Sequence, residues 1–202
     1  MRKPATTQAP IADLIANRWS ARAFDPNKSV SQAQIIALCE AARWAPSCFG
    51  DEPWRFIVCQ KNSAQNIEKD SWQLAFDCLA TSNQIWVKNA SVLMLVCADT
   101  LFGHNQTANR WAQYDTGAAA ISLCLQASSM GLMTHQMGGF NMETARESFK
   151  IPAQIIPMAM IAIGFEGDAN LLPEDLKTRE MATRKRKPMG DLFFAGDWNK
   201  PV

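Results

Sequence analysis

The stretch from Asn109 to Met130 constrains the fold of this chain more than any other segment. Its alanines, leucines and isoleucine put apolar residues on almost every side of a helix, and Gly131 follows as a helix stop. A helix that is apolar on nearly all sides has to be covered by other elements. We therefore expect it to be the central and most buried helix.

Shorter apolar segments on both sides of this helix predict strands. Arg55–Gln60 is partly β-branched, and Ser91–Ala98 is almost continuously hydrophobic, which is typical of a strand covered on both faces. A third strand is expected over Met158–Ile163. Because helices alternate with these strands, the residues favour an α+β or α/β class with a small sheet.

Further helices are expected where apolar residues recur at helical spacing. They cover Ile11 to just before Arg18, the stretch after the S-x-x-Q capping box of Ser31 and Gln34, most of Ser63–Asn89, and about Glu143–Phe149. After Gly167 the chain loses periodicity. A long aperiodic tail stays ordered only by lying against something.

Composition narrows the classes of function. There are 20 Lys and Arg against 19 Asp and Glu, so the net charge of +1 attracts neither nucleic acid nor an anionic membrane. The six cysteines stand singly, which predicts reduced thiols, no metal site and a cytoplasmic location. No signal peptide or transmembrane helix is expected. With 202 residues, 48% of them hydrophobic, one domain is the default.

Two basic segments are candidates for holding a phosphate. Arg18, Ser20 and Arg22 bring two cations and a hydroxyl together near the end of the first helix. Arg184 and Arg186 would point the same way in an extended chain, so both segments could converge on one phosphate. Taken alone, each segment is more simply explained as solvated surface charge, and Arg179–Lys187 would also suit a nucleic-acid binder.

Two turns have backbone that a planar ligand could approach closely. One is Pro46–Asp51, and the other is Thr134–Phe140 with its adjacent glycines after an expected strand. Plain connectors would account for both turns. The chain has no G-x-G-x-x-G, Walker or G-x-S-x-G motif and only two histidines, which disfavours metal-assisted and triad hydrolysis.

In their order along the chain, these segments resemble the FMN-dependent nitroreductase family. The resemblance rests on "RWSARAF", "ARWAPSCFGDEPWRF", "SNQIWVKNASVLMLV", "DTGAAAISLCLQASSMGL", "MGGF" and "RKRKP", and it covers about Ile11 to Trp198. It implies an α+β (α/β sandwich) fold in which helices surround a small mixed sheet. It also implies one domain over residues 1–202, in which residues 168–202 form an extended C-terminal arm exchanged in a homodimer.

The resemblance further implies which residues contact FMN. Arg18, Ser20 and Arg22 would contact the phosphate, ribityl chain and ring, with Arg184 and Arg186 completing the phosphate site. Asn83 would hydrogen-bond the polar end of the ring system, and Gln136–Gly139 would place backbone near its reactive nitrogen. The Pro46 turn would reach the flavin of the other subunit. The full implied set is Arg18, Trp19, Ser20, Arg22, Pro46, Ser47, Cys48, Gly50, Asn83, Gln136, Met137, Gly138, Gly139, Arg184 and Arg186.

The implied activity is reduction of nitroaromatic, quinone or similar flat acceptors by NADH or NADPH in a ping-pong reaction, with no catalytic side chain. Acceptors would bind around Phe102 and Trp111. Dehalogenation, enone reduction, azoline oxidation and flavin binding without turnover are the alternatives. Two departures bear on these alternatives, because Gly50 and Glu52 stand where many members have Asn and Gln.

Overall fold

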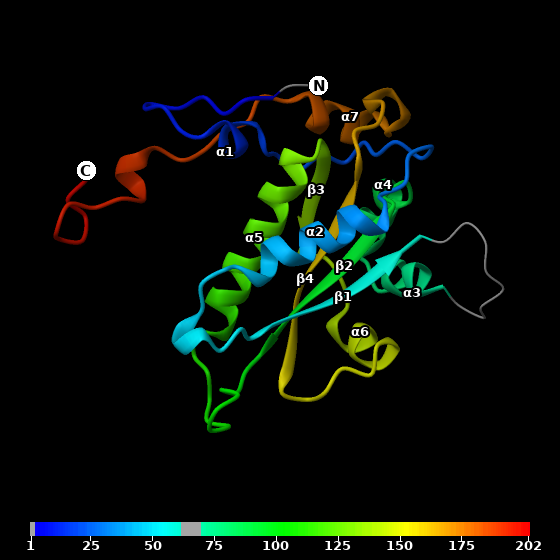
Figure 1. Ribbon diagram of the computed structural model, residues 1–202. Helices are drawn as coiled ribbons and strands as arrows, with labels where there is room; N and C mark the ends of the chain where they lie inside the picture. The colour runs from blue at the N-terminus through cyan, green and yellow to red at the C-terminus, as the bar shows by residue number, and fades with distance from the viewer. Residues whose placement is uncertain (1–2, 62–69) are drawn as a thin grey trace.

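The computed structural model describes residues 3–61 and 70–202, and its centre is a four-stranded sheet (Figure 1). The strands follow the order β1-β2-β4-β3, and their bounds are β1 Trp54–Gln60, β2 Val92–Asp99, β3 Leu132–Met137 and β4 Ile155–Phe165. All neighbouring strands pair antiparallel. Among the described residues, parallel pairing occurs at one isolated bridge, between Ser20 and Thr134 on β3. The predicted α+β class with a small sheet is confirmed.

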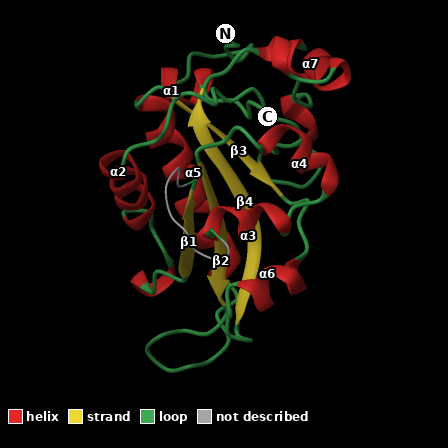
Figure 2. Ribbon diagram, turned by 90° about the vertical axis from the view of Figure 1, so that its right-hand side faces the viewer, coloured by secondary structure: helices red, strands yellow, loops and turns green. Residues whose placement is uncertain are grey.

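Helices cover both faces of this sheet, as Figures 1 and 2 show. One face carries α2 (Gln32–Arg43) and α5 (Ala112–Ser129). The other carries three short helices, α3 (Ser71–Asp77), α4 (Thr81–Val87) and α6 (Met142–Ser148). The nearly continuous apolar run of β2 follows from this arrangement, because alternate residues face two separate cores.

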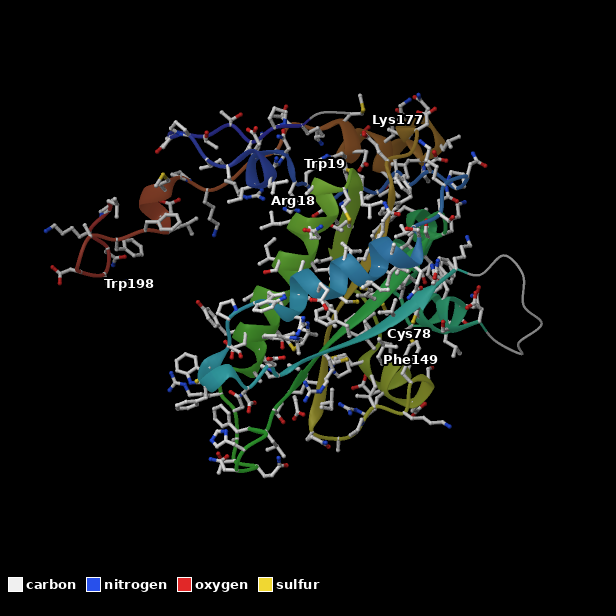
Figure 3. The ribbon with its side chains drawn as sticks, in the orientation of Figure 1. Arg18, Trp19, Cys78, Phe149, Lys177 and Trp198 are labelled. Carbon is white, nitrogen blue, oxygen red and sulfur yellow. The ribbon has the colours of Figure 1, made fainter. Side chains whose placement is uncertain are left out.

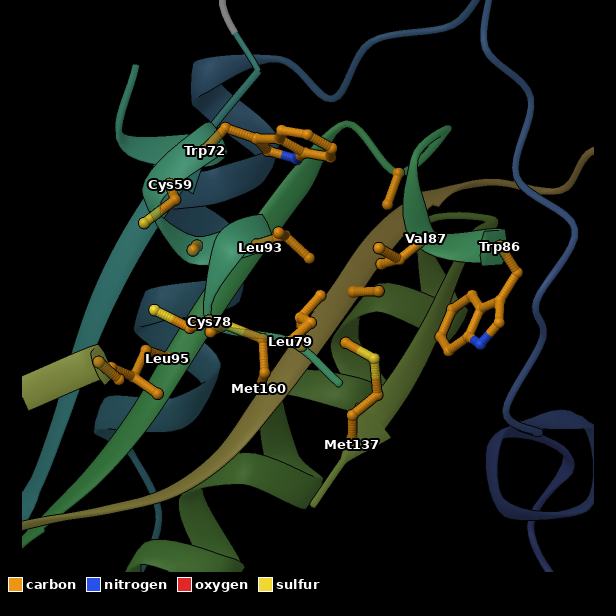
Figure 4. Close-up of a cluster of buried hydrophobic side chains, with 14 of the residues drawn as sticks. Cys59, Trp72, Cys78, Leu79, Trp86, Val87, Leu93, Leu95, Met137 and Met160 are labelled. Atoms are coloured by element: carbon orange, nitrogen blue, oxygen red, sulfur yellow. The ribbon is translucent and has the colours of Figure 1, made fainter. Parts of the chain in front are cut away.

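The two cores are divided by the side-chain alternation of β2. Leu93 and Leu95 point into the core under α3, α4 and α6, where Figure 4 shows them near Trp72 and Met160. Met94, on the opposite side of the strand, belongs to the core under α2 and α5. The predicted strand is therefore buried on both faces, as its sequence indicated.

The central helix α5 differs from its prediction on one side. Ala119, Leu123 and Ala127 are fully buried against the sheet. The opposite side of the same helix is open, with Tyr114 78% and Ile121 42% exposed. The expectation of burial on almost every side is therefore wrong for the single chain, because no described element covers this outer face.

Most predicted local elements agree with the structure. The capping box of α2 is present, since Gln34 N donates to Ser31 Oγ at 3.3 Å and Ser31 N donates to Gln34 Oε1 at 3.0 Å. The first helix is α1 (Asp13–Asn17). The expected helical stretch over 63–89 contains α3 and α4, while its residues 63–69 lie outside the described part.

The C-terminal region contains a helix that the sequence did not predict. This helix is α7 (Glu174–Met181), and its buried residues are Leu176 and Glu180. Two buried positions, one of them charged, leave no apolar stripe to recognise. Beyond Ala182 the chain runs away from the sheet to its end in Figure 1. None of the helices in the described ranges is long and apolar enough to cross a membrane.

Candidate active site

The first basic segment lies along the outer edge of β3. Ser20 forms the parallel bridge to Thr134, and the next residue is fixed as well, because His135 Nδ1 lies 3.0 Å from the carbonyl oxygen of Ala21. Trp19 is buried, whereas Ser20 is exposed. The segment is thus held as an extra partial strand that leaves the Ser20 hydroxyl accessible.

The second basic segment returns to meet the first. Arg184 Nη1 donates to the carbonyl oxygens of Lys3 at 2.8 Å and Ala16 at 2.6 Å. These contacts bring the two predicted phosphate-binding segments to one surface depression of about 220 Å³, which we call the cationic hollow (Figure 3 labels Arg18). Its polar lining comprises Lys3, Arg18, Ser20, Arg22, Arg179, Thr183, Arg184 and Arg186.

The charge of the cationic hollow is one-sided. No Asp or Glu of the described residues lines it. Burial, Arg18 and Arg186 all lower the pKa of Arg184, and burial is also the largest cause of the lowered pKa of Lys3. Cations held this close together without a carboxylate among them fit an anionic group with several acceptor oxygens, such as a phosphate. The FMN contacts assigned to these residues stay a prediction.

A buried carboxylate supports the hollow from behind. Glu180 is 2% exposed, and its oxygens accept hydrogen bonds from Arg22 N at 2.9 and 3.1 Å and from Ala23 N at 3.1 Å. The Arg22 guanidinium lies 3.8 Å from the same carboxylate. Glu180 therefore orients the Arg22 backbone, and sequence reasoning missed it because no local pattern connects α7 with residues 22 and 23.

The glycine turn after β3 continues the same edge of the sheet. Asn83 Nδ2 donates to the carbonyl oxygen of Gly139 at 3.0 Å, and Ala80 N donates to it at 2.9 Å. A β-carbon on Gly139 would lie 2.8 Å from Asn83 Nδ2, so a larger residue here would displace the Asn83 amide. The N–H groups of Gly138 and Gly139 have no hydrogen-bond partner among the described residues.

Two predicted residues beside this turn point elsewhere. Met137 is 3% exposed and its side chain belongs to the core, so only its backbone is available to a ligand. Gln136 is exposed, and its Nε2 donates to Cys124 Sγ at 3.4 Å. Asn83, Gln136, Gly138 and Gly139 therefore share the β3 edge with Ser20.

The Pro46 turn lies away from this edge within the single chain. Cys48 N donates to Asp115 Oδ2 at 2.9 Å, in the first turn of α5, whereas Gln136 contacts Cys124 further along that helix. The helix rises roughly 13 Å between Asp115 and Cys124. Pro46, Ser47, Cys48 and Gly50 are thus not brought together with the arginines by this chain alone.

Backbone strain marks the Pro46 turn. Phe49, Gly50 and Glu52 have φ values of 56°, 65° and 50°. Glycine and asparagine are the residues that best tolerate this region, so Gly50 suits its φ, whereas Phe49 and Glu52 adopt it at a cost. Asp51 holds the turn, since it accepts hydrogen bonds from Gly103 N at 2.8 Å and Asn109 Nδ2 at 3.4 Å.

An exposed aromatic group sits on this braced turn. The ring of Phe49, which is 83% exposed, lies 5.8 Å from that of Phe102 and 5.9 Å from that of His104. Phe102, predicted to contact acceptors, therefore belongs to this group. Trp111, the other predicted residue, is 39% exposed at the start of α5, where Arg110 covers its ring.

Neither histidine is placed for metal or triad chemistry. Burial lowers the pKa of His135 to about 4, so its imidazole is neutral near pH 7 and its Nδ1–H can donate to Ala21 O. His104 Nδ1 lies 3.8 Å from Asp51 Oδ1 at the surface. Among the described residues, no three His, Cys, Asp or Glu side chains are grouped to hold a metal ion.

Comparison with known proteins assigns the fold to a family. The model of the nitroreductase family matches residues 15–165. The chain belongs to the nitroreductase family. Among solved structures, this nitroreductase is similar to one described as the oxidoreductase containing FMN, with 33% identity, a TM-score of 0.88 and 96% of each chain covered.

Two curated relatives add to this similarity. The nitroreductase is 26% identical over 181 residues to protein DrgA of Synechocystis, which covers 75% of this chain and 82% of that protein. It is 36% identical over 63 residues to the major NAD(P)H-flavin oxidoreductase of Aliivibrio fischeri, which covers 31% of this chain and 29% of that protein.

Proposed function

We propose that this chain is an FMN-dependent NAD(P)H oxidoreductase that reduces flat acceptors, such as nitroaromatics and quinones, in a ping-pong reaction. The observation that carries the proposal is the cationic hollow, whose residue Ser20 pairs with β3, together with the N–H groups of Gly138 and Gly139 after that strand, which have no partner among the described residues. Membership of the nitroreductase family supports it, as does the FMN named for the similar solved structure. The NAD(P)H donor agrees with the name of the Aliivibrio relative.

The phosphate of FMN would bind to Arg18, Ser20, Arg22, Arg184 and Arg186. Guanidinium groups and a hydroxyl are the donors that phosphate oxygens prefer, and charge-assisted bonds of this kind are about twice as strong as neutral ones. Trp19 contributes by anchoring the segment, because its side chain is buried.

The ring of FMN would lie along the β3 edge. Asn83 donates to Gly139 through Nδ2, so its Oδ1 is available as an acceptor. The free N–H groups of the glycine turn would stabilise negative charge that develops on the ring during reduction. FMN, when bound, supplies the two-electron transfer from the nicotinamide to the acceptor.

We infer that the active unit is a homodimer, in which Pro46, Ser47, Cys48 and Gly50 complete the site of the partner subunit. The distance of this turn from the arginines supports the inference. So do the apolar side chains exposed on the outer face of α5. Within residues 168–202, Glu180 and Arg184 contact this chain's own Arg22 and Lys3, so the part of the arm that follows Arg186 would lie on the partner. The partner would then cover Trp198, which is 81% exposed in the single chain.

The exposed aromatic group formed by Phe49, Phe102 and His104 would then bind the acceptor. Its rings present a flat apolar surface next to the turn that is proposed to reach the partner's flavin. A flat electrophile can stack there at little entropic cost, because Asp51 already braces both loops.

The test is the visible absorbance of the purified protein before and after anaerobic addition of NADPH or NADH. We expect oxidised flavin bands that bleach with the donor and recover when a nitroaromatic or quinone is added. Flavin that stays oxidised would indicate binding without turnover, and a protein that FMN cannot reconstitute would refute the proposal.

A matched pair of variants ties this result to the cationic hollow. Arg18→Gln removes a guanidinium that has no hydrogen bond to a described residue, so it should weaken FMN binding with little effect on folding. Arg43→Gln is the control, because Arg43 pairs with Glu40 on the exposed side of α2. Equal FMN affinity in both variants would show that the hollow does not hold the phosphate.

A further inference from the structure

Three arginines of the cationic hollow also face a second depression. This one, of about 290 Å³, is lined by Ala5, Thr6, Thr7, Ile11 and Ile15 together with Arg18, Arg184 and Arg186, and we call it the N-terminal hollow. The arginines thus form a wall common to both depressions. A group bound in one hollow lies next to the same cations as a group bound in the other.

The positive charge around this wall exceeds what one phosphate neutralises. Six Lys and Arg side chains line the cationic hollow, whereas a phosphate monoester carries about two negative charges at neutral pH and the Glu180 carboxylate beside Arg22 adds one more. Arg184 cannot move away to relieve the repulsion, because its guanidinium is hydrogen-bonded to Lys3 O and Ala16 O. The surplus cations leave room for a second anionic group on the other side of the wall.

The N-terminal hollow also has surfaces for a neutral, planar part of a ligand. Ile11 and Ile15 are 43% and 53% exposed and together give the hollow an apolar side. The hydroxyls of Thr6 and Thr7 have no hydrogen-bond partner among the described residues. The isoleucines provide an apolar surface for a base, the hydroxyls can bind a ribose, and the guanidinium groups can bind a phosphate. Together these groups suit a nucleoside with a phosphate on its ribose.

We propose that the N-terminal hollow binds the adenosine end of the nicotinamide donor through its ribose 2′-phosphate, so that NADPH is preferred to NADH. This inference rests on the proposed function, because it assigns the FMN phosphate to the cationic hollow. Arg18 and Arg186 are the cations that the 2′-phosphate contacts. Thr6 donates to its oxygens or to the ribose.

The experiment uses the FMN-loaded protein and two probes. Isothermal titration compares adenosine 2′,5′-bisphosphate, the adenosine half of NADPH, with adenosine 5′-monophosphate. We expect the bisphosphate to bind the loaded protein at least about tenfold more tightly. Steady-state assays should give a kcat/KM for NADPH about tenfold above that for NADH, with a ratio that falls as salt is raised.

Thr7 offers a matched pair of variants, since it is exposed and has no role in the FMN site. Thr7→Glu adds a carboxylate facing the arginine wall, and it should lower kcat/KM for NADPH about tenfold while that for NADH stays near its original value. Thr7→Gln has nearly the same size without the charge, and it should leave both values near those of the parent protein.

Three results would overturn the inference while leaving the proposed function intact. They are equal kcat/KM for the two donors, an equal loss for both donors in Thr7→Glu, and bisphosphate binding that occurs only in the FMN-free protein. The last result would mean that the flavin uses all of the arginines. Failure to bind FMN at all is measured first, and it would refute the proposed function together with this inference.

Discussion

The substitution Glu180→Gln tests how α7 organises the segment that is proposed to bind phosphate. The carboxylate is 2% exposed and accepts three contacts from Arg22 N and Ala23 N at 2.9 to 3.1 Å. A glutamine keeps one acceptor oxygen but turns an NH₂ toward backbone donors. At least one buried N–H therefore loses its partner, and the Arg22 guanidinium, 25% exposed, loses its counter-charge.

The expected loss of stability follows from these contacts. A hydrogen bond to a charged group contributes about 1.5–3 kcal/mol, and a buried donor left unpaired costs about 1–3 kcal/mol. Since the glutamine retains part of the network, we expect the free energy of unfolding to fall by about 3 kcal/mol. For a domain of this size that loss lowers Tm by roughly 10 °C. FMN affinity should also fall, by about tenfold, because Ser20 and Arg22 shift together.

Urea unfolding and FMN titration, at a fixed protein concentration, measure the two effects. Glu174→Gln on the same helix is the control, because its side chain is 85% exposed and pairs with Lys177 only at 4.0 Å. That variant should stay within about 0.5 kcal/mol of the parent protein. If Glu180→Gln is equally stable, or if both variants lose the same amount, the supporting role of Glu180 is refuted.

Three further substitutions probe the rest of the site. Gly139→Ala puts a β-carbon 2.8 Å from Asn83 Nδ2, so it should weaken FMN binding and shift the flavin absorbance bands. Burial lowers the pKa of His135 from the ordinary 6.5 to about 4, so acid favours the unfolded state, which takes up the proton first. The free energy of unfolding should therefore fall by up to about 3 kcal/mol as pH drops from 6.5 to 4. Urea unfolding of His135→Gln should lack this pH dependence. Tyr114→Glu puts a charge on the outer face of α5 and should convert the dimer to monomer in light scattering, whereas Gln113→Glu should not.

Each of these predictions has a contradicting result. Unchanged flavin affinity and bands in Gly139→Ala would mean that the glycine turn does not border the ring. An equal loss of stability toward acid in His135→Gln would assign that loss to other groups. A Tyr114→Glu protein that remains a flavin-loaded dimer would mean that the subunits meet elsewhere.

The sequence predicted those helices and strands that are determined by residues close together in the chain. The capping box of Ser31 and Gln34 is a contact between residues one helical turn apart, and the run Val92–Ala98 is apolar because both of its faces are covered. Each of these causes leaves its pattern within a few residues of chain. Such elements were therefore predicted to within one or two residues.

The interactions that build the site were not visible in this way. Arg184 and Ala16 meet across 168 residues, and Glu180 and Arg22 across 158. The basic residues themselves were found because charge stands out in the sequence, but their carboxylate support was not, since α7 has no apolar periodicity. Asp115, which accepts a hydrogen bond from Cys48 N, does stand out in the sequence, because it is a lone acidic residue within an apolar helix.

The contact between Glu180 and residues 22 and 23 also sets an order of events during synthesis. A ribosome makes Arg18, Ser20 and Arg22 first, and the backbone N–H groups of Arg22 and Ala23 have no carboxylate to bind until Glu180 has been made. Arg184 emerges later still. Domains gain their long-range contacts only when both partners have left the ribosome. If FMN binds at the proposed site, flavin loading would therefore follow the completion of α7.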